Sequence, residues 1–335
     1  MDSLTQAALG GVVAYVVLGP NIGKRAALYG IALGTIPDLD VLIDFGGPIE
    51  NMTHHRGFSH SFLVQTAVSP ILGWLFSQRT GGREASFSQW STAIFLCFIT
   101  HSLADFFTVY GTQLLWPLTN HPFAHAILFI IDPAYTLPLI IALIGILIIR
   151  NRGVAQKLNL GMLTLSTMYL IWSVGAKLVI DRQVQFALNA RGIHPDVYES
   201  APAPLNTLLW RAVAVEKETY HEIWVSVFDE VDDIQVRSFD RGLTLLKPIE
   251  NHPSVRRLQW FTKGLYKAWQ EENVIYLSDL RMGIEGAYVF NFEVGRRSGE
   301  TLKLGSFKQV SERPNVKRLP MIWERIFDPS VTPEP

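Results

Sequence analysis

The first 180 residues alternate long apolar stretches with short polar connections. Six stretches approach the roughly 17–25 residues with which a helix crosses a bilayer. They lie near residues 4–19, 26–43, 61–76, 92–110, 124–149 and 158–180. Pro37 should end or kink the second, because proline disrupts a helix interior. The pattern predicts a polytopic α-helical membrane domain of about six spans over residues 1–180.

After residue 180 the pattern becomes that of a small water-soluble α+β domain. Residues 181–204 are predicted to be a proline-containing linker and residues 205–335 the domain itself. Residues 208–229 alternate apolar and polar positions about a turn, which predicts a β-hairpin. Residues 251–273 place apolar side chains at helical spacing, which predicts a helix; these are Val255, Leu258, Phe261, Leu265 and Trp269. Residues 274–283 and 287–295 are expected to be further strands.

Charge divides the chain at the same place. Residues 1–180 contain 9 Lys+Arg and 8 Asp+Glu, whereas residues 181–335 contain 20 and 22. A charge-poor half followed by a charge-rich half is typical of a bilayer domain joined to a soluble one. The net charge of −1 gives no reason to expect nucleic acid as a partner.

The basic residues of the connections predict the orientation in the membrane. The second and fourth connections contain only Arg56, whereas the first, third and fifth contain seven basic residues. By the positive-inside rule, the side with seven faces the cytoplasm. The N-terminus, residues 51–61 and everything after residue 180 are then expected on the extracytoplasmic side. The seven residues are Lys24, Arg25, Arg79, Arg83, Arg150, Arg152 and Lys157.

Polar residues gather at that same outer face. Ionisable groups beside hydrocarbon are costly, and they usually mark function. Their convergence from five separate segments therefore predicts one site rather than scattered solvation. The residues are Asp2; Asp38, Asp40 and Asp44; His54, His55, Arg56 and His60; His101 and Asp105; and His121, His125 and Asp132.

Two short motifs have the spacing of metal ligands. "HSLAD" places His101 and Asp105 one helical turn apart on the same face, where both could bind one ion. The alternative is a histidine hydrogen-bonded to a carboxylate that orients it. "PDLD" places Asp38 and Asp40 in a turn after a helix-ending proline. The alternative there is simply a polar helix C-terminus.

A third motif, "HHRGFSH", offers His55 and His60 with Gly57 between them for backbone freedom. The alternative is a polar loop at the level of the lipid headgroups. Taken together, the three motifs supply enough carboxylates and imidazoles for one or two divalent ions. Nitrogen and oxygen donors without thiolate suit Zn²⁺ or Mn²⁺, and such ions activate water. Arg56 would then bind an anionic group, most simply a phosphate.

Five motifs give the chain a resemblance to a known family. They are "MDSLTQ", "GTIPDLD", "HRGFSHS", "HSLADFFTVYGTQLLWPL" and "IIDPAYTLPL". In this order they resemble the bacterial membrane-bound metal-dependent hydrolases, the YdjM-like group, also described as LexA-binding and inner-membrane-associated. The likeness covers roughly residues 1–180.

The resemblance implies a polytopic membrane protein with a metal site. Its metal ligands would be Asp38, Asp40, His55, His60, His101 and Asp105, and Asp132 would be a further polar site residue. One position departs from the pattern, because Gln6 stands after Thr5 where a histidine is expected. The loss of that imidazole favours a single-metal site or an altered activity. The charge distribution also disagrees with a LexA partner, since the site and the C-terminal domain are expected outside the cytoplasm.

These observations lead to one hypothesis with two alternatives. The chain is predicted to be a metal-dependent hydrolase at the extracytoplasmic face of the bacterial inner membrane. Its partners would be membrane lipids, and its substrate a phospholipid or another lipid-linked phosphoester. The first alternative is a transporter or proton relay that uses intramembrane histidines and acids. The second is a membrane-anchored regulator with a structural metal, whose soluble domain binds a partner protein.

Overall fold

The computed structural model describes residues 1–79, 85–299, 301–310 and 319–333. Arg83, one of the basic residues that predict the orientation, lies outside these ranges. The described chain divides into two compact units. The first contains Met1–Asp44 and His54–Val174, and the second contains Phe45–Thr53 and Gly175–Pro335.

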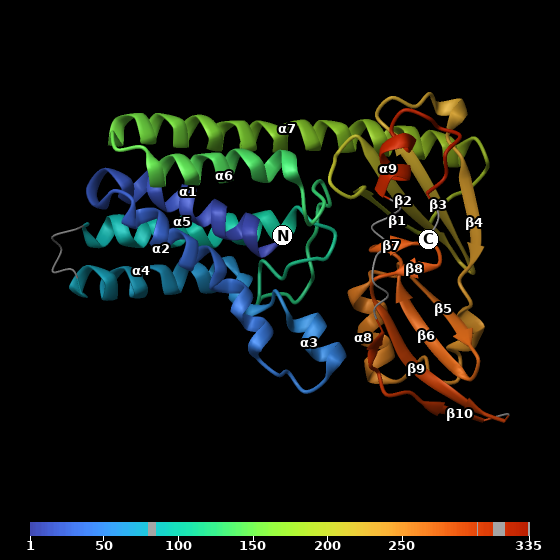
Figure 1. Cartoon of the computed structure of the whole chain (residues 1–335). Helices are drawn as coiled ribbons and strands as arrows, with labels where there is room; N and C mark the ends of the chain where they lie inside the picture. The colour runs from blue at the N-terminus through green and yellow to red at the C-terminus, as the bar shows by residue number, and fades with distance from the viewer. Residues whose placement is uncertain (80–84, 300, 311–318, 334–335) are drawn as a thin grey trace. The chain divides into compact units, whose positions relative to one another are not determined.

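The first unit is a bundle of helices that run roughly parallel or antiparallel to one another (Figure 1). Apolar side chains from different helices form its core, including Leu18, Trp90, Ile94 and Leu139. The helices are α1 (Ser3–Ile22), α2 (Arg25–Thr35), α4 (Phe62–Arg79), α5 (Phe87–Phe106), α6 (Pro133–Ile148) and α7 (Arg152–Asn189), of which α7 continues into the second unit. Two short 3₁₀ helices, η1 (Pro37–Leu42) and η2 (Phe58–His60), lie in the connections.

Small residues bring α1 and α2 into close contact. A Cβ atom added to Gly30 would lie 2.2 Å from the Gly10 carbonyl oxygen, and one added to Gly10 would lie 2.3 Å from the Gly30 oxygen. Backbones approach this closely only where side chains are absent, as at helix interfaces in membranes. The glycines thereby fix α2, and with it the turn that follows α2, against the rest of the bundle.

The expected number of spans is not supported. Among the described residues, only α1 and α7 are long and apolar enough to cross a membrane, and α6 is a shorter apolar helix. Helix α2 has 11 residues and ends at Thr35, because Pro37 starts the 3₁₀ turn as expected. Helix α6 begins at Pro133 instead of near residue 124, because Asp132 caps it there and the chain before it is a loop.

The second unit is rich in β-structure. Strands β1 (Val197–Pro202), β2 (Leu209–Glu216), β3 (Thr219–Ser226) and β4 (Val236–Asp240) form one antiparallel sheet in that order. A second antiparallel sheet has the order β10 (Thr301–Leu304), β9 (Asn291–Ser298), β6 (Val274–Asp279) and β5 (Tyr266–Glu271), with β11 (Gln309–Val310) also paired to β9. Strands β7 (Gly283–Ile284) and β8 (Ala287–Tyr288) form a small hairpin. The short helices are α3 (Pro48–His54), α8 (Pro253–Phe261) and α9 (Leu319–Arg325).

The structure confirms the predicted hairpin as β2 and β3, and it confirms strands in 274–283 and 287–295. The helix predicted over 251–273 is wrong in its second half. Helix α8 ends at Phe261 because Lys263 and Gly264 have positive φ angles, 56° and 84°, which no right-handed helix accommodates. Residues 181–204, predicted as a linker, contain the end of α7 and all of β1.

We expect Gly30→Ala to destabilise the first unit, because the added methyl group would overlap the Gly10 carbonyl. Overpacking of this kind costs roughly 1–3 kcal/mol of unfolding free energy, which should appear as a lower thermal midpoint of the detergent-solubilised protein. Gly161→Ala is the matched control, because Gly161 also lies in a helix and has nothing within 4 Å of the added Cβ. Equal midpoints for the two variants would contradict the close packing of α1 and α2.

Candidate metal centre

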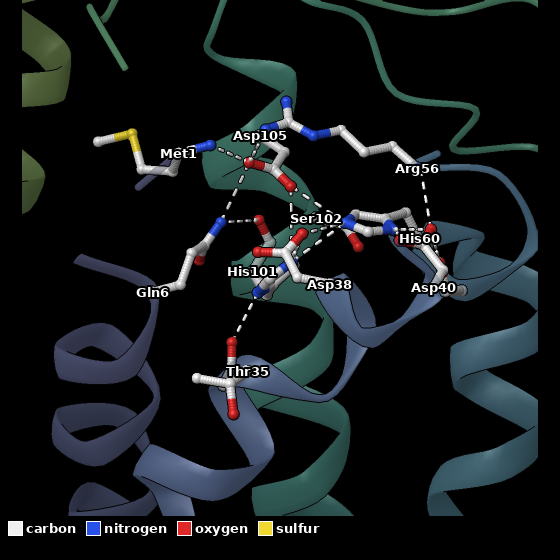
Figure 2. A network of polar contacts seen from close by, with 12 residues as sticks. Met1, Gln6, Thr35, Asp38, Asp40, Arg56, His60, His101, Ser102 and Asp105 are labelled. Atoms are coloured by element: carbon white, nitrogen blue, oxygen red, sulfur yellow. Dashed lines mark hydrogen bonds and ion pairs between the residues drawn. The ribbon is translucent and has the colours of Figure 1, made fainter. Parts of the chain in front are cut away.

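Four side chains of the first unit point at one small volume. Asp38, His60, His101 and Asp105 each offer one ligand atom, and these four atoms all lie within 4.8 Å of one another. Figure 2 shows the carboxylate of Asp38 and the two imidazole rings turned toward the lower oxygen of Asp105. Three of the side chains are 0–1% exposed, and Asp38 is 24% exposed. The group is therefore buried on every side except the side of Asp38.

Three segments distant in sequence supply these residues. Asp38 lies in η1, where Pro37 ends the helical run of α2. His60 is the last residue of η2, which follows the tight turn at Gly57. A Cβ atom on Gly57 would lie 2.7 Å from the His54 carbonyl oxygen, so only glycine fits. His101 and Asp105 lie one turn apart on α5, as their spacing predicts.

Hydrogen bonds fix the orientation of both rings. The Nδ1 atom of His101 donates to the Gly34 carbonyl (2.7 Å), which can only accept. The Nδ1 atom of His60 lies 2.9 Å from Ser59 Oγ, and that hydroxyl donates its own hydrogen to Asp40 (2.6 Å). Nδ1 is thus the donor in each ring, and each Nε2 faces the carboxylates of the group.

The distances in the group match those between the ligands of one ion. The two Nε2 atoms are 3.1 Å apart. Oδ2 of Asp105 is 3.0 Å from Nε2 of His60 and 3.4 Å from that of His101, and Oδ1 of Asp38 is 3.4 and 3.5 Å from the same two atoms. Ligands bound tetrahedrally at about 2.0–2.1 Å, the Zn–N distance, stand about 3.3–3.4 Å apart. The residues fit a bound divalent ion.

A buried acceptor without a donor supports the same conclusion. Oδ1 of Asp38 has no hydrogen-bond partner among the described residues. It faces the Nε2 atoms of His60 and His101, at 3.4 and 3.5 Å. Such an arrangement is costly in the interior of a protein, and a cation at its centre would satisfy all four groups together.

The structure places Asp40 and His55 beside this group rather than in it. His55 Nδ1 donates to Asp40 Oδ1 (2.7 Å), while Asp40 Oδ2 accepts from the Arg56 amide (2.9 Å) and from Ser59 Oγ. Burial raises the pKa of the Asp40 carboxyl, but the hydrogen bond and charge of His55 outweigh burial and hold the pKa below its usual value. Through Ser59, Asp40 orients His60. The predicted ligand roles of Asp40 and His55 stay predictions.

Arg56 is buried, with an exposed fraction of 7%. Its guanidinium lies 3.1 Å from Oδ1 of Asp105, donates to Thr108 Oγ1 (3.2 Å) and stands over the ring of Tyr110. These contacts hold it against the metal group. Its predicted role in binding an anionic substrate stays a prediction.

Asp132 caps α6. Its carboxylate accepts hydrogen bonds from the amides of Ala134 and Tyr135 and from the Tyr169 hydroxyl. It is not among the four grouped residues of the described chain, so its predicted catalytic role also stays a prediction.

The contacts that Gln6 and Met1 make at the site do not follow from the sequence. Gln6 was expected to matter only as a missing imidazole, yet its amide nitrogen donates to Asp105 Oδ1 (3.1 Å) and to the His101 carbonyl (3.3 Å). The amino group of Met1 contacts the same Asp105 oxygen. Nothing in the spacing of these residues indicates such contacts, because they depend on how α1 packs against α5.

Comparison with known proteins places the site in a family context. The model of a family described as "YdjM inner membrane protein" matches residues 1–183, which contain all four grouped residues. An uncharacterized protein of Bacillus subtilis, YfhP, is 27% identical over 135 residues, which cover 38% of this chain and 39% of that protein. The chain thus spans about two-fifths of the length of this curated relative. No solved structure matches the chain.

We expect Asp40→Asn to weaken metal binding by roughly 10- to 100-fold, the usual effect of losing a group that orients a ligand. The asparagine keeps the shape of the side chain but loses the charge that holds Ser59 and, through it, His60. Titration of the metal-free protein with zinc would measure the change. Asp44→Asn is the matched control, because Asp44 is exposed on the same connection. Unchanged affinity in Asp40→Asn would show that Asp40 does not orient the site.

Proposed function

The chain belongs to the family of YdjM inner membrane proteins, and from that membership and the geometry of the four-residue group we propose that it is a metal-dependent hydrolase. One observation carries the proposal: the Nε2 atoms of two imidazoles lie 3.1 Å apart and 3.0–3.5 Å from the same two carboxylate oxygens. The absence of sulfur among these donors favours Zn²⁺ or Mn²⁺. A metal held by these residues would activate water only where it keeps a position open for it.

A divalent ion bound here would supply Lewis acidity and lower the pKa of a bound water. The chain's own residues then do the remaining work. His60 and His101 are fixed in orientation by Ser59 and by the Gly34 carbonyl. Asp38 stands at the partly exposed side of the group, so substrate and water approach past this residue. The deep burial of the other three ligands keeps bulk water away from the remaining sides.

We propose a lipid-linked phosphoester as the substrate, because the segments that hold the ligands also expose large apolar side chains. Leu39, Val41 and Leu42 in η1 are 53%, 69% and 79% exposed, and Asp38 lies in the same turn. Phe58, two residues before His60, contacts Trp116, and both are more than a third exposed. Apolar side chains beside a buried polar site suit a substrate with a hydrocarbon chain and an anionic head.

We also propose that the chain crosses the membrane more than once, with its C-terminal domain outside the cytoplasm. The charge bias of the connections supports this orientation. If α1 enters the cytoplasm and α7 leaves it, the ends of both helices agree with that bias, because Lys24 and Arg152 then lie inside. Apolar side chains exposed along α6 and α7 suit contact with lipid; they include Ile141, Ile144, Met168, Ile171 and Trp172.

The test is hydrolysis of a phosphomonoester lipid, phosphatidic acid, in mixed micelles by the purified full-length protein. We expect phosphate release that stops on chelation and returns when Zn²⁺ or Mn²⁺ is added. His101→Ala should abolish release, since the ring supplies one of the four ligands. His194→Ala is the matched control, because His194 is an exposed histidine of the second unit. Release that survives both chelation and His101→Ala would refute the proposal.

A further inference from the structure

The two oxygens of Asp105 face different partners. Oδ2 belongs to the four-atom group, next to His60 and His101. Oδ1 faces the other way, toward the guanidinium of Arg56 and the amide nitrogen of Gln6, each at 3.1 Å, and it also contacts the amino group of Met1. In Figure 2 Gln6 approaches Asp105 from the side away from His60. The carboxylate therefore lies between the candidate metal position and a fixed positive charge.

We propose that this site binds one metal ion and that Arg56, assisted by Gln6, occupies the place where a second ion would be bound. The inference rests on the proposed metal-dependent function and concerns the number of ions. In two-metal sites the ions are about 3.5–4 Å apart and share bridging ligands. Asp105 is the residue whose two oxygens could bridge two ions here. Its Oδ1 atom, however, is already paired with the N–H groups of Arg56 and Gln6.

Electrostatics oppose a second ion at that oxygen. The guanidinium keeps its positive charge at every physiological pH. It is held in place by Thr108 Oγ1 and by the ring of Tyr110, 4.9 Å from the centroid. A divalent ion bound to the same oxygen would be within a few ångströms of this charge in a buried volume, where repulsion between like charges is strong.

The described residues around Asp105 also offer no free ligand for a second ion in their present arrangement. Gln6 presents its nitrogen to the site, because both of its neighbours there, Asp105 Oδ1 and the His101 carbonyl, are acceptors. Its oxygen has no hydrogen-bond partner among the described residues and belongs to the opposite end of the amide. Asp40 could bind a second ion only by giving up its contacts with His55, Ser59 and the Arg56 amide.

Arg56 is thus a positioning residue. It acts through Asp105, keeping Oδ2 directed at the ion, and it supplies the second positive charge that another metal would supply elsewhere. This role explains why an arginine is buried beside a candidate cation site, although its positive charge repels a metal ion.

The number of bound ions tests the inference directly. Purified full-length protein, loaded with excess Zn²⁺ and freed of unbound metal, would be analysed for zinc by mass spectrometry and for protein by amino-acid analysis. We expect one ion per chain. Two ions per chain would overturn this inference and leave the proposed function standing, whereas no ion would refute the proposed function itself.

Variants test which residues exclude the second ion. The double variant Arg56→Gln with Gln6→His removes the guanidinium charge and offers an imidazole lone pair, and we expect it to bind two ions. Arg56→Lys keeps the charge and should bind one, as should Arg79→Gln, an exposed arginine at the end of α4. A folded double variant that still binds one ion would overturn the role given to Arg56 and Gln6. Circular dichroism and size-exclusion profiles would establish that each variant is folded.

Discussion

The mutual repulsion of four electron-rich atoms is the constraint on which the site depends. Two carboxylate oxygens do not stay 3.0–3.5 Å from the same two imidazole nitrogens in a buried volume unless a cation or hydrogens lie between them. The Nδ1 atoms of both rings face Gly34 and Ser59, so Nε2 is the ring atom that each histidine can offer to a metal. A divalent ion among the four atoms would hold the group together.

Helix packing in the first unit positions the residues of this group. The close contact of α1 with α2 at Gly10 and Gly30 fixes the end of α2, and Pro37 then turns the chain so that Asp38 reaches His101. The packing of α1 against α5 aligns Gln6 with Asp105. Packing far from the site therefore determines which donors and acceptors meet in it.

The sequence alone was informative where chemistry depends on local geometry. The pairing of His101 with Asp105 follows from helical spacing, and the break at Pro37 follows from the chemistry of proline. The sequence does not predict contacts that depend on packing between helices. Whether Asp38 or Asp40 faces His60 depends on the exact turn of η1, and the placement of Arg56 against Asp105 depends on a positive φ angle of 63°. Apolar stretches likewise indicated helices but not their lengths, as α2 shows.

X-ray absorption spectroscopy of the zinc-loaded, full-length protein tests the central claim most directly, because it reports the atoms bound to the metal. The account predicts nitrogen and oxygen neighbours at about 2.0–2.1 Å, with the multiple scattering of two imidazole rings from His60 and His101. A spectrum without imidazole scattering, or with sulfur bound to the zinc, would contradict it.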